Sequence, residues 1–165
     1  MQKVTFVIGA NAAGKTYFIE HHLASEKAVV LNIYDYQQKV YDEHGNKELI
    51  TFEEQFRCLK KANEKHLHDI INELKQGNDV IAEQTFFKAK RRIAYIDEIR
   101  KEMDVKIEVY VMYPSNKRWI ENSKKREDIE NIEVYENQKK QMEFPNPAEG
   151  FDAIFEVVDD HTSDG

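Results

Sequence analysis

Short apolar runs alternate with longer segments of mixed polarity along the whole chain. The apolar runs are rich in β-branched residues and have the length of strands buried inside a sheet. The predicted strands are 4–8, 28–33, 79–83, 105–112 and 150–158. The segments between them carry apolar residues at three- and four-residue spacings, which is typical of helices with one buried face. This alternation favours an α/β fold with a parallel sheet.

The clearest predicted helix runs from Thr51 to about residue 76. Its start has the pattern of a capping box, with Thr51 followed three residues later by Glu54, and a Gly-Asn pair follows its end. His66 and His68 lie two positions apart and therefore on different helix faces, so we expect solvated histidines rather than a metal-binding pair. We expect the apolar residues of this helix to form one buried stripe, made of Phe52, Phe56, Leu59, Ala62, Leu67, Ile70, Ile71 and Leu74.

Length and charge narrow the class of protein. The chain has 165 residues and a formal net charge of −7, which predicts a single domain over residues 1–158 with a frayed acidic tail at 159–165. The negative charge argues against broad coating of nucleic acid, although a local basic groove is compatible with it. No apolar run has the ~18–20 residues of a membrane span, no signal peptide precedes the first strand, and the single Cys58 cannot form an internal disulfide. We therefore expect a cytoplasmic protein.

One glycine-containing motif carries the strongest chemical signal. Residues 9–16 match the P-loop, or Walker A, pattern G-x-x-x-x-G-K-[ST] and lie between a predicted strand and a predicted helix, 16–23. The glycines let backbone N–H groups point at phosphate oxygens, and the helix N-terminus adds positive potential. We expect Lys15 to reach the β- and γ-phosphates of ATP and the Thr16 hydroxyl to bind Mg²⁺. The expected nucleotide-binding residues are Gly9, Ala10, Asn11, Ala12, Ala13, Gly14, Lys15 and Thr16.

Carboxylates follow two other predicted strands. Ligands of open parallel sheets bind beyond the carboxyl ends of the strands, so Asp35, after the second strand, can face a substrate. Asp35 can also cap a following helix, with Gln38 three residues on, and the two roles are compatible. Glu83 ends the third strand, where P-loop proteins carry an acid that holds Mg²⁺, and nearby Thr85 is a candidate substrate-binding residue. The alternative for Glu83 is a charge that simply ends a strand.

Positive charge gathers at the start of the helix that is predicted to end near residue 103. Cations are unfavourable at a helix N-terminus, so these side chains either face solvent or bind an anion such as a phosphate-bearing substrate. Arg91 and Arg92 are the candidate substrate-binding residues of this cluster.

Residues 115–128 are also strongly basic and are predicted to be helical, with a further helix at 132–144. A solvated surface helix is one interpretation of 115–128, and a lid that closes over ATP is the other, which we favour. Lys125 and Arg126 are its candidate ATP-binding residues. Arg126 is the preferred catalytic cation, because its planar guanidinium group matches phosphate oxygens.

With these motifs placed, the chain resembles the P-loop kinases of the polynucleotide 5′-hydroxyl kinase group over nearly its whole length. The resemblance implies a P-loop NTPase fold with a five-stranded parallel sheet, helices on both faces and a helical lid. It also implies an ATP site at Lys15 and Thr16, and Asp35 as the general base on an acceptor hydroxyl. The matching pieces are residues 9–16, 31–36, 83–86, 91–92, 122–126 and 144–152.

Several positions depart from that group's pattern. Tyr34 precedes Asp35, and Gln37 and Gln38 follow it, where the group usually carries arginines that hold substrate phosphate. Glu121 stands where a lid arginine is common, and Glu83 replaces the more usual aspartate. The chain is also similar to the zeta-toxin kinases, in the long helix before the third strand and in the segment 83–85.

The sequence therefore predicts an ATP- and Mg²⁺-dependent kinase that transfers the γ-phosphate to a hydroxyl group. The acceptor can be a small molecule, a nucleotide or a nucleic acid, and the net charge does not favour nucleic acid. Two alternatives stay open, namely a zeta-toxin-like kinase of nucleotide sugars and a non-catalytic ATP-binding switch. A GTP switch is disfavoured, because no guanine-reading N-K-x-D motif occurs. The oligomeric state also stays open.

Overall fold

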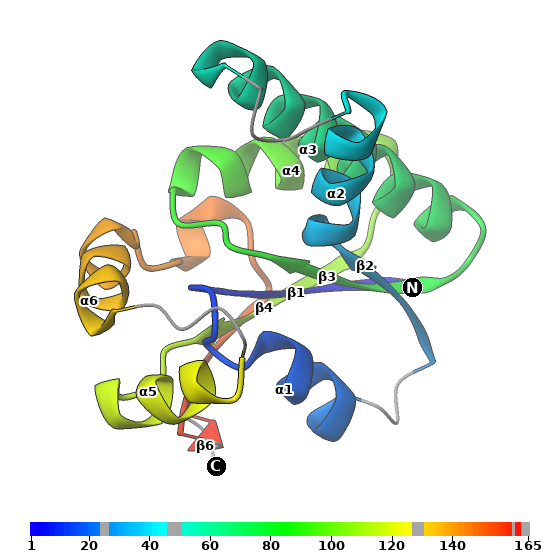
Figure 1. Ribbon diagram of the computed structural model, residues 1–165. Helices are drawn as coiled ribbons and strands as arrows, with labels where there is room; N and C mark the ends of the chain where they lie inside the picture. Colours follow the sequence, from blue (N-terminus) through cyan, green and yellow to red (C-terminus); the bar gives the residue numbers. More distant parts are fainter. Residues whose placement is uncertain (24–26, 46–50, 127–130, 160, 163–165) are drawn as a thin grey trace.

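The sheet has six strands in the order β2-β3-β1-β4-β5-β6. The computed structural model describes residues 1–23, 27–45, 51–126, 131–159 and 161–162 (Figure 1). The five longer strands are parallel, as the sequence predicted, and they are β1 (Lys3–Gly9), β2 (Ala28–Asn32), β3 (Asp79–Gln84), β4 (Lys106–Met112) and β5 (Ala153–Val158). The sequence did not predict β6 (His161–Thr162), which pairs antiparallel with β5 inside the segment that was expected to fray.

Helices cover both faces of the sheet, which confirms the α/β class. On one face lie α3 (Phe52–Lys75) and α4 (Ala89–Glu102), with α2 (Ile33–Glu43) packed on α3. On the other face lies α1 (Lys15–His22), joined toward the carboxyl ends of the strands by α5 (Asn116–Lys124) and α6 (Ile132–Gln141). In Figure 1 these carboxyl ends point to the left, away from the N-terminus. A short 3₁₀ helix, η2 (Pro147–Glu149), precedes β5.

Two apolar cores fill the space between the sheet and its helices. The first includes Phe6, Ile70 and Ile96 and holds α3 and α4 on the sheet. The second includes Phe18, Trp119 and Tyr135 and holds α1, α5 and α6 on the opposite face. A third, smaller cluster joins α2 to α3 away from the sheet, and it contains Ile33, Val40, Cys58 and Ala62. The helix α2 is therefore attached mainly through another helix.

Local capping residues fix the helix boundaries near the expected positions. The capping box of Thr51 and Glu54 starts α3 as predicted. The helix α2 starts earlier than expected, because the Asn32 side chain accepts a hydrogen bond from the Tyr34 N–H and caps it. Asp35 consequently lies in the first turn of α2 rather than at its N-cap. Its negative charge is favourable in that first turn, close to the positive end of the helix dipole.

The predicted stripe of α3 is buried only in its C-terminal part. Ala62, Ile70 and Leu74 are buried, but Phe52 and Phe56 are 84% and 62% exposed, and Leu59 is also exposed. The expectation for these three residues is wrong, because the N-terminal half of α3 extends beyond the sheet, and its buried residues Cys58 and Ala62 pack against α2 (Figure 1).

The expectation of a solvated His66 is also wrong. Its Nε2 donates to the Leu31 carbonyl oxygen over 2.9 Å, and its Nδ1 lies 3.0 Å from the Tyr95 hydroxyl oxygen. The residue is fully buried, and burial lowers the pKa of its imidazole to about 4, so the ring is neutral near pH 7. His66 joins α3 to β2 and α4 as a core polar residue.

Arg92, expected to bind substrate, instead holds the loop after β3 in place. Its side chain is 0% exposed and pairs with both carboxylate oxygens of Glu149, at 2.7 and 3.0 Å. It also donates to the carbonyl oxygens of Phe86 and Glu143, each over 2.7 Å. Phe86 has a left-handed φ of 47°, which is uncommon for a bulky residue and needs such support.

We predict that Arg92→Ala destabilises the protein strongly, because it leaves the Glu149 carboxylate buried without its partner. The expected loss in the free energy of unfolding is about 3–5 kcal/mol, measured by urea denaturation. The control is Lys61→Ala, since its ion pair with Glu43 is exposed and should contribute little. Equal effects of the two changes would contradict a supporting role for the buried pair.

Candidate functional site

Residues 9–16 form a tight loop between the carboxyl end of β1 and the start of α1. Gly9 and Gly14 have φ values of 148° and 92°, in the region that favours glycine. At Gly9 a Cβ atom would also lie only 2.7 Å from the Met112 carbonyl oxygen, so the neighbouring strand excludes any side chain. Gly14 is the N-cap residue of α1, so the loop leads directly into a helix N-terminus. This is the strand–loop–helix geometry of an anion site.

Lys15 is folded back into the loop. Its Nζ donates to the carbonyl oxygens of Gly9, at 2.7 Å, and Ala10, at 3.1 Å. Burial lowers the pKa of Lys15 to about 8, against the attraction of Glu83, and nearby Arg126 lowers it further. The loop therefore contains a cation that has lost most of its hydration and has no carboxylate within salt-bridge distance among the described residues.

Thr16 and Glu83 meet beside Lys15. The Thr16 hydroxyl donates to Glu83 Oε1 over 2.8 Å, which joins the start of α1 to the carboxyl end of β3. Burial raises the pKa of the Glu83 carboxyl, although the Thr16 hydrogen bond and Lys15 oppose that shift. A hydroxyl and one carboxylate side by side are the protein ligands that Mg²⁺ accepts, since it keeps several waters and binds substrate phosphate. The donor set therefore fits the predicted magnesium ion.

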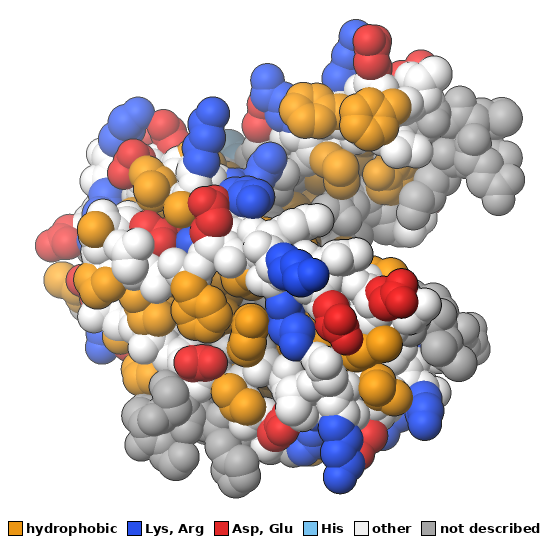
Figure 2. Space-filling view, turned by 90° about the vertical axis from the view of Figure 1, so that its left-hand side faces the viewer, with side chains coloured by type: hydrophobic (Ala, Val, Ile, Leu, Met, Phe, Trp, Pro, Cys, Tyr) orange, Lys and Arg blue, Asp and Glu red, His pale blue; other side chains and the backbone are white. Residues whose placement is uncertain are grey.

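A cavity of about 770 Å³ opens over these side chains. The lid candidates Lys125 and Arg126 line it together with Lys15 and Thr16, so the structure brings these predicted residues together. In Figure 2 the surface is hollowed between the upper and lower parts of the molecule, and Lys and Arg side chains border the hollow. The complete lining is Asn11, Ala12, Ala13, Gly14, Lys15, Thr16, Tyr17, Tyr34, Gln37, Glu83, Asn122, Lys125 and Arg126.

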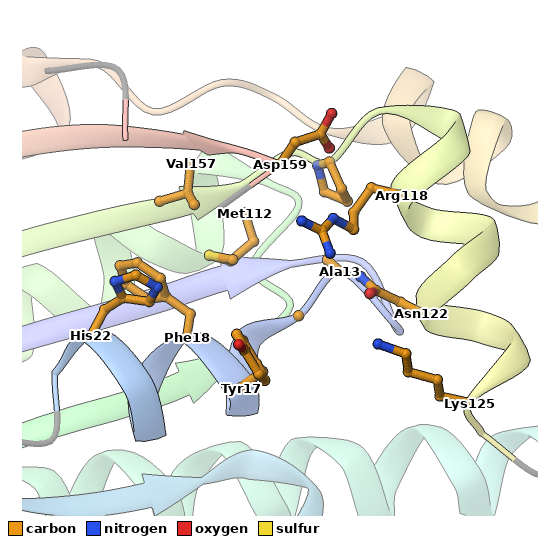
Figure 3. Close-up of a pocket in the computed structure, with 12 residues that line it drawn as sticks. Ala13, Tyr17, Phe18, His22, Met112, Arg118, Asn122, Lys125, Val157 and Asp159 are labelled. Carbon is orange, nitrogen blue, oxygen red and sulfur yellow. The ribbon is translucent and has the colours of Figure 1, made fainter. Parts of the chain in front are cut away.

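A second pocket adjoins the loop on the side of α1 and β5. In Figure 3, Tyr17, Phe18 and His22 approach it from α1, whereas Arg118 and Asn122 approach it from α5 and Lys125 from the end of that helix. Met112 and Val157 also line it, as does Asp159 after β5. The pocket is thus partly aromatic, with a guanidinium group at its edge, and it shares Gly14 and Lys125 with the larger cavity.

The helix α5 is docked directly on the loop. The Trp119 indole Nε1 donates to the Asn11 carbonyl oxygen over 2.8 Å, and Asn122 Nδ2 donates to the Ala12 carbonyl oxygen over 3.0 Å. Asp159 holds the other end of α5 by accepting from the Ser115 N–H. The helix ends at Lys124, before the predicted boundary, and residues 127 and 128 of the predicted lid lie outside the described residues.

The other predicted site residues, Asp35, Thr85, Arg91 and Arg92, do not line the larger cavity. Asp35 is exposed in the first turn of α2, three residues after Asn32, which pairs with Glu83 in the sheet. Burial raises the pKa of the Glu83 carboxyl, and the charge of Asp35 adds to that shift. Thr85 is half-buried, and its N–H and hydroxyl donate to Gln84 Oε1. Arg91 is exposed at the start of α4. Arg92 is excluded from the site by its buried ion pair.

Sequence reasoning missed several residues that contribute to the site, including Tyr17, which lines both pockets. Tyr34 and Gln37 lie one turn apart on α2 and line the cavity, whereas Trp119 and Asn122 attach α5 to the loop. For Tyr34 and Gln37, the one available signal in the sequence was that they stand where the polynucleotide kinase group usually carries arginines. The spacing of Trp119 and Asn122 by three residues indicates a shared helix face but does not identify the surface that it contacts.

The comparisons with known proteins agree with this geometry. A family model described as an AAA domain matches residues 4–145, and the chain belongs to this family of P-loop proteins. A search of curated protein sequences finds no significant match. The resemblance to P-loop kinases is confirmed at the level of family and fold.

Three solved structures illustrate that fold. A provisionally assigned kinase of Chloroflexus aurantiacus is 14% identical, with a TM-score of 0.70, and the match covers 96% of this chain and 86% of that one. A chain of the Pnkp1/Rnl/Hen1 RNA repair complex is 16% identical, with a TM-score of 0.63 and coverage of 86% and 44%. A chain of the PezAT chromosomal toxin–antitoxin system of Streptococcus pneumoniae is 11% identical, with a TM-score of 0.63 and coverage of 99% and 73%.

The described part of the chain contains neither a membrane-crossing helix nor a carboxylate- and histidine-rich metal cluster. Within it, no helix is both long enough and apolar enough to cross a membrane. Nor do the described residues contain a cluster of three or more His, Cys, Asp or Glu side chains suited to hold a metal ion. A magnesium ion at Thr16 and Glu83 would therefore rely on water and on phosphate oxygens for its other ligands.

We predict that the affinity for ATP with Mg²⁺ falls as the pH rises through about 8. Lys15 loses its proton above this value in the free protein, and only the protonated amine attracts phosphate. Affinity should fall by up to about tenfold per pH unit above the pKa. Calorimetric titration across this range measures it, and Lys15→Met should bind weakly with little dependence on pH. An equally steep fall in Lys15→Met would assign the titration to another group.

Proposed function

We propose that the protein is an ATP-dependent kinase that transfers the γ-phosphate to a hydroxyl group. The observation that carries this proposal is the convergence of Lys15, Thr16, Glu83 and Arg126 on one cavity. A loop of inward-pointing amides, a buried cation, a magnesium-type ligand pair and a lid cation are the parts that phosphoryl transfer needs. Membership in a P-loop family, in which nucleotide and Mg²⁺ are general cofactors, supports ATP as the donor.

The two cavities suggest how ATP would bind. Its phosphates would occupy the loop beside Lys15, and its base would enter the partly aromatic pocket between α1 and α5. Thr16 and Glu83 would hold Mg²⁺, which when bound neutralises charge on the β- and γ-phosphate oxygens. Arg126 and Lys125 would contact the γ-phosphate from the lid side and stabilise charge that develops during transfer.

Asp35 is the proposed general base. It would accept the proton of the acceptor hydroxyl while the oxygen bonds to the γ-phosphorus and the bond from that phosphorus to the bridging oxygen of ADP breaks. Its exposed position in the first turn of α2 and its electrostatic effect on Glu83 support this role. The carboxylate would also orient the acceptor hydroxyl toward the γ-phosphorus. This orientation matters because phosphoryl transfer relies mainly on alignment and charge compensation.

The α2 wall of the cavity supports an acceptor without a phosphate group near the reacting hydroxyl. Its lining residues on α2 are Tyr34 and Gln37, which are both uncharged and both able to hydrogen-bond a hydroxyl. A phosphate-terminated acceptor would need a cation there. A nucleotide-sugar acceptor is the second candidate, supported by the match to the toxin–antitoxin chain along almost the whole of this protein.

The direct test is transfer of label from γ-labelled ATP. The protein is incubated with Mg²⁺ and separate pools of sugars and polyols, nucleosides, nucleotide sugars, and oligonucleotides with a free 5′-hydroxyl. We expect label in the sugar or nucleoside pool, and label in the nucleotide-sugar pool would favour the second candidate. ATP binding without transfer to any pool would favour a non-catalytic switch.

We predict that Asp35→Asn lowers the rate of transfer by about 10²–10⁴-fold while leaving ATP affinity nearly unchanged. The amide keeps the size of the side chain but cannot accept the proton. Single-turnover kinetics and calorimetry measure the two quantities separately. Asp42→Asn is the matched control, because this carboxylate lies about two turns further along the same helix, where it accepts a hydrogen bond from Gln38. Undiminished transfer by Asp35→Asn would exclude it as the base.

A further inference from the structure

Asn11 is held from both sides of the cavity. Its carbonyl oxygen accepts from the Trp119 indole of α5, and its side-chain oxygen accepts a hydrogen bond from the Tyr34 hydroxyl of α2. Asn11 itself is the third residue of the phosphate-binding loop. One loop residue thus connects the lid helix with the helix that carries Asp35.

The Tyr34 hydroxyl also lies over Lys15. The Lys15 Nζ donates to the Tyr34 oxygen at 3.4 Å, and the same Nζ lies 5.4 Å from the centre of the Tyr34 ring. The hydroxyl oxygen therefore occupies a position on Lys15 that an oxygen of a bound phosphate would take. Tyr34 and Lys15 both line the larger cavity, so this contact lies in the path of an entering triphosphate.

We propose that Tyr34 is an internal ligand of the phosphate site, which closes the site on Asn11 and Lys15 until a nucleotide displaces it. This inference rests on the proposed nucleotide site. The entering phosphate takes over the Lys15 ammonium group, and the Tyr34 hydroxyl leaves Asn11. Because Tyr34 and Asp35 are adjacent in the first turn of α2, displacement of Tyr34 also changes the position of the proposed base. Nucleotide and acceptor binding are thereby linked through a single helical turn.

This arrangement predicts that the loss of a polar group from the binding site strengthens nucleotide binding rather than weakens it. Removing the Tyr34 hydroxyl takes away hydrogen bonds that exist only in the free protein, so binding no longer has to break them. Tyr34→Phe should therefore bind ATP about three- to tenfold more tightly than the unmodified protein, a factor typical of one net hydrogen bond. A hydroxyl that contacts the bound phosphate would give the opposite result.

The experiment is calorimetric titration with the non-hydrolysable analogue of ATP in the presence of Mg²⁺. Fluorescence of Trp119, the single tryptophan of the chain, gives a second readout, because its indole is bonded to Asn11. The matched control is Tyr36→Phe, whose hydroxyl lies in the same helix but bonds to Asp69 outside the cavity. Its nucleotide affinity should equal that of the unmodified protein.

Asn11→Ala removes the same hydrogen bond from the loop side. If Tyr34→Phe does not fold, the ATP affinity of Asn11→Ala alone measures the effect of that bond. If the bond between the two side chains closes the site, each single change tightens binding, and the double variant gains less than the product of the two effects. Two results would contradict the role of Tyr34 as an internal ligand but leave the nucleotide site intact. One is a double variant whose gain in affinity equals the product of the two single gains. The other is unchanged or weaker ATP binding by Tyr34→Phe when the unmodified protein binds ATP. Absence of binding by the unmodified protein would overturn the nucleotide site as well.

Discussion

The burial of one ammonium group in a loop of backbone carbonyl oxygens is the interaction on which the site depends. Lys15 has given up most of its hydration, and the carbonyl oxygens of Gly9 and Ala10 replace only part of it. A cation in this state gains more from a phosphate oxygen than an exposed lysine would, because the local dielectric constant is low. The unfavourable free energy of burying this charge is offset by the packing of the rest of the fold, in which strands hold the loop and helices cover it.

The surrounding structure contacts that loop from several directions. The end of β4 packs closely against Gly9, and side chains of α5 donate to two loop carbonyl groups. On the other side of β3, the buried pair of Arg92 and Glu149 supports the left-handed backbone at Phe86. Positioning of this kind is the main contribution that a protein makes to phosphoryl transfer.

Much of the fold and the strand–loop–helix geometry around Lys15 could be predicted, because they follow from local patterns. Strand periodicity and the residues of the loop are both encoded within short segments, and so was the capping box of α3. The errors arose where contacts between distant segments decide the outcome. Arg91 and Arg92 look equivalent in the sequence, but adjacent residues of a helix point in different directions, and only Arg92 pairs with Glu149. Likewise, the depth of His66 and the exposure of Phe52 depend on where α3 leaves the sheet, which its own periodicity does not specify.

The separate cluster between α2 and α3 has a consequence for how this protein can change over evolutionary time. The cavity wall that carries Tyr34 and Gln37 is held by the cluster of Ile33, Val40, Cys58 and Ala62, whereas α1 and α5 are held by the core around Phe18 and Trp119. If the proposed function holds, replacements in the first cluster can reshape acceptor recognition without disturbing the packing beneath the loop that would bind the triphosphate. A lineage with this architecture can therefore exchange one acceptor for another while its energy source stays the same.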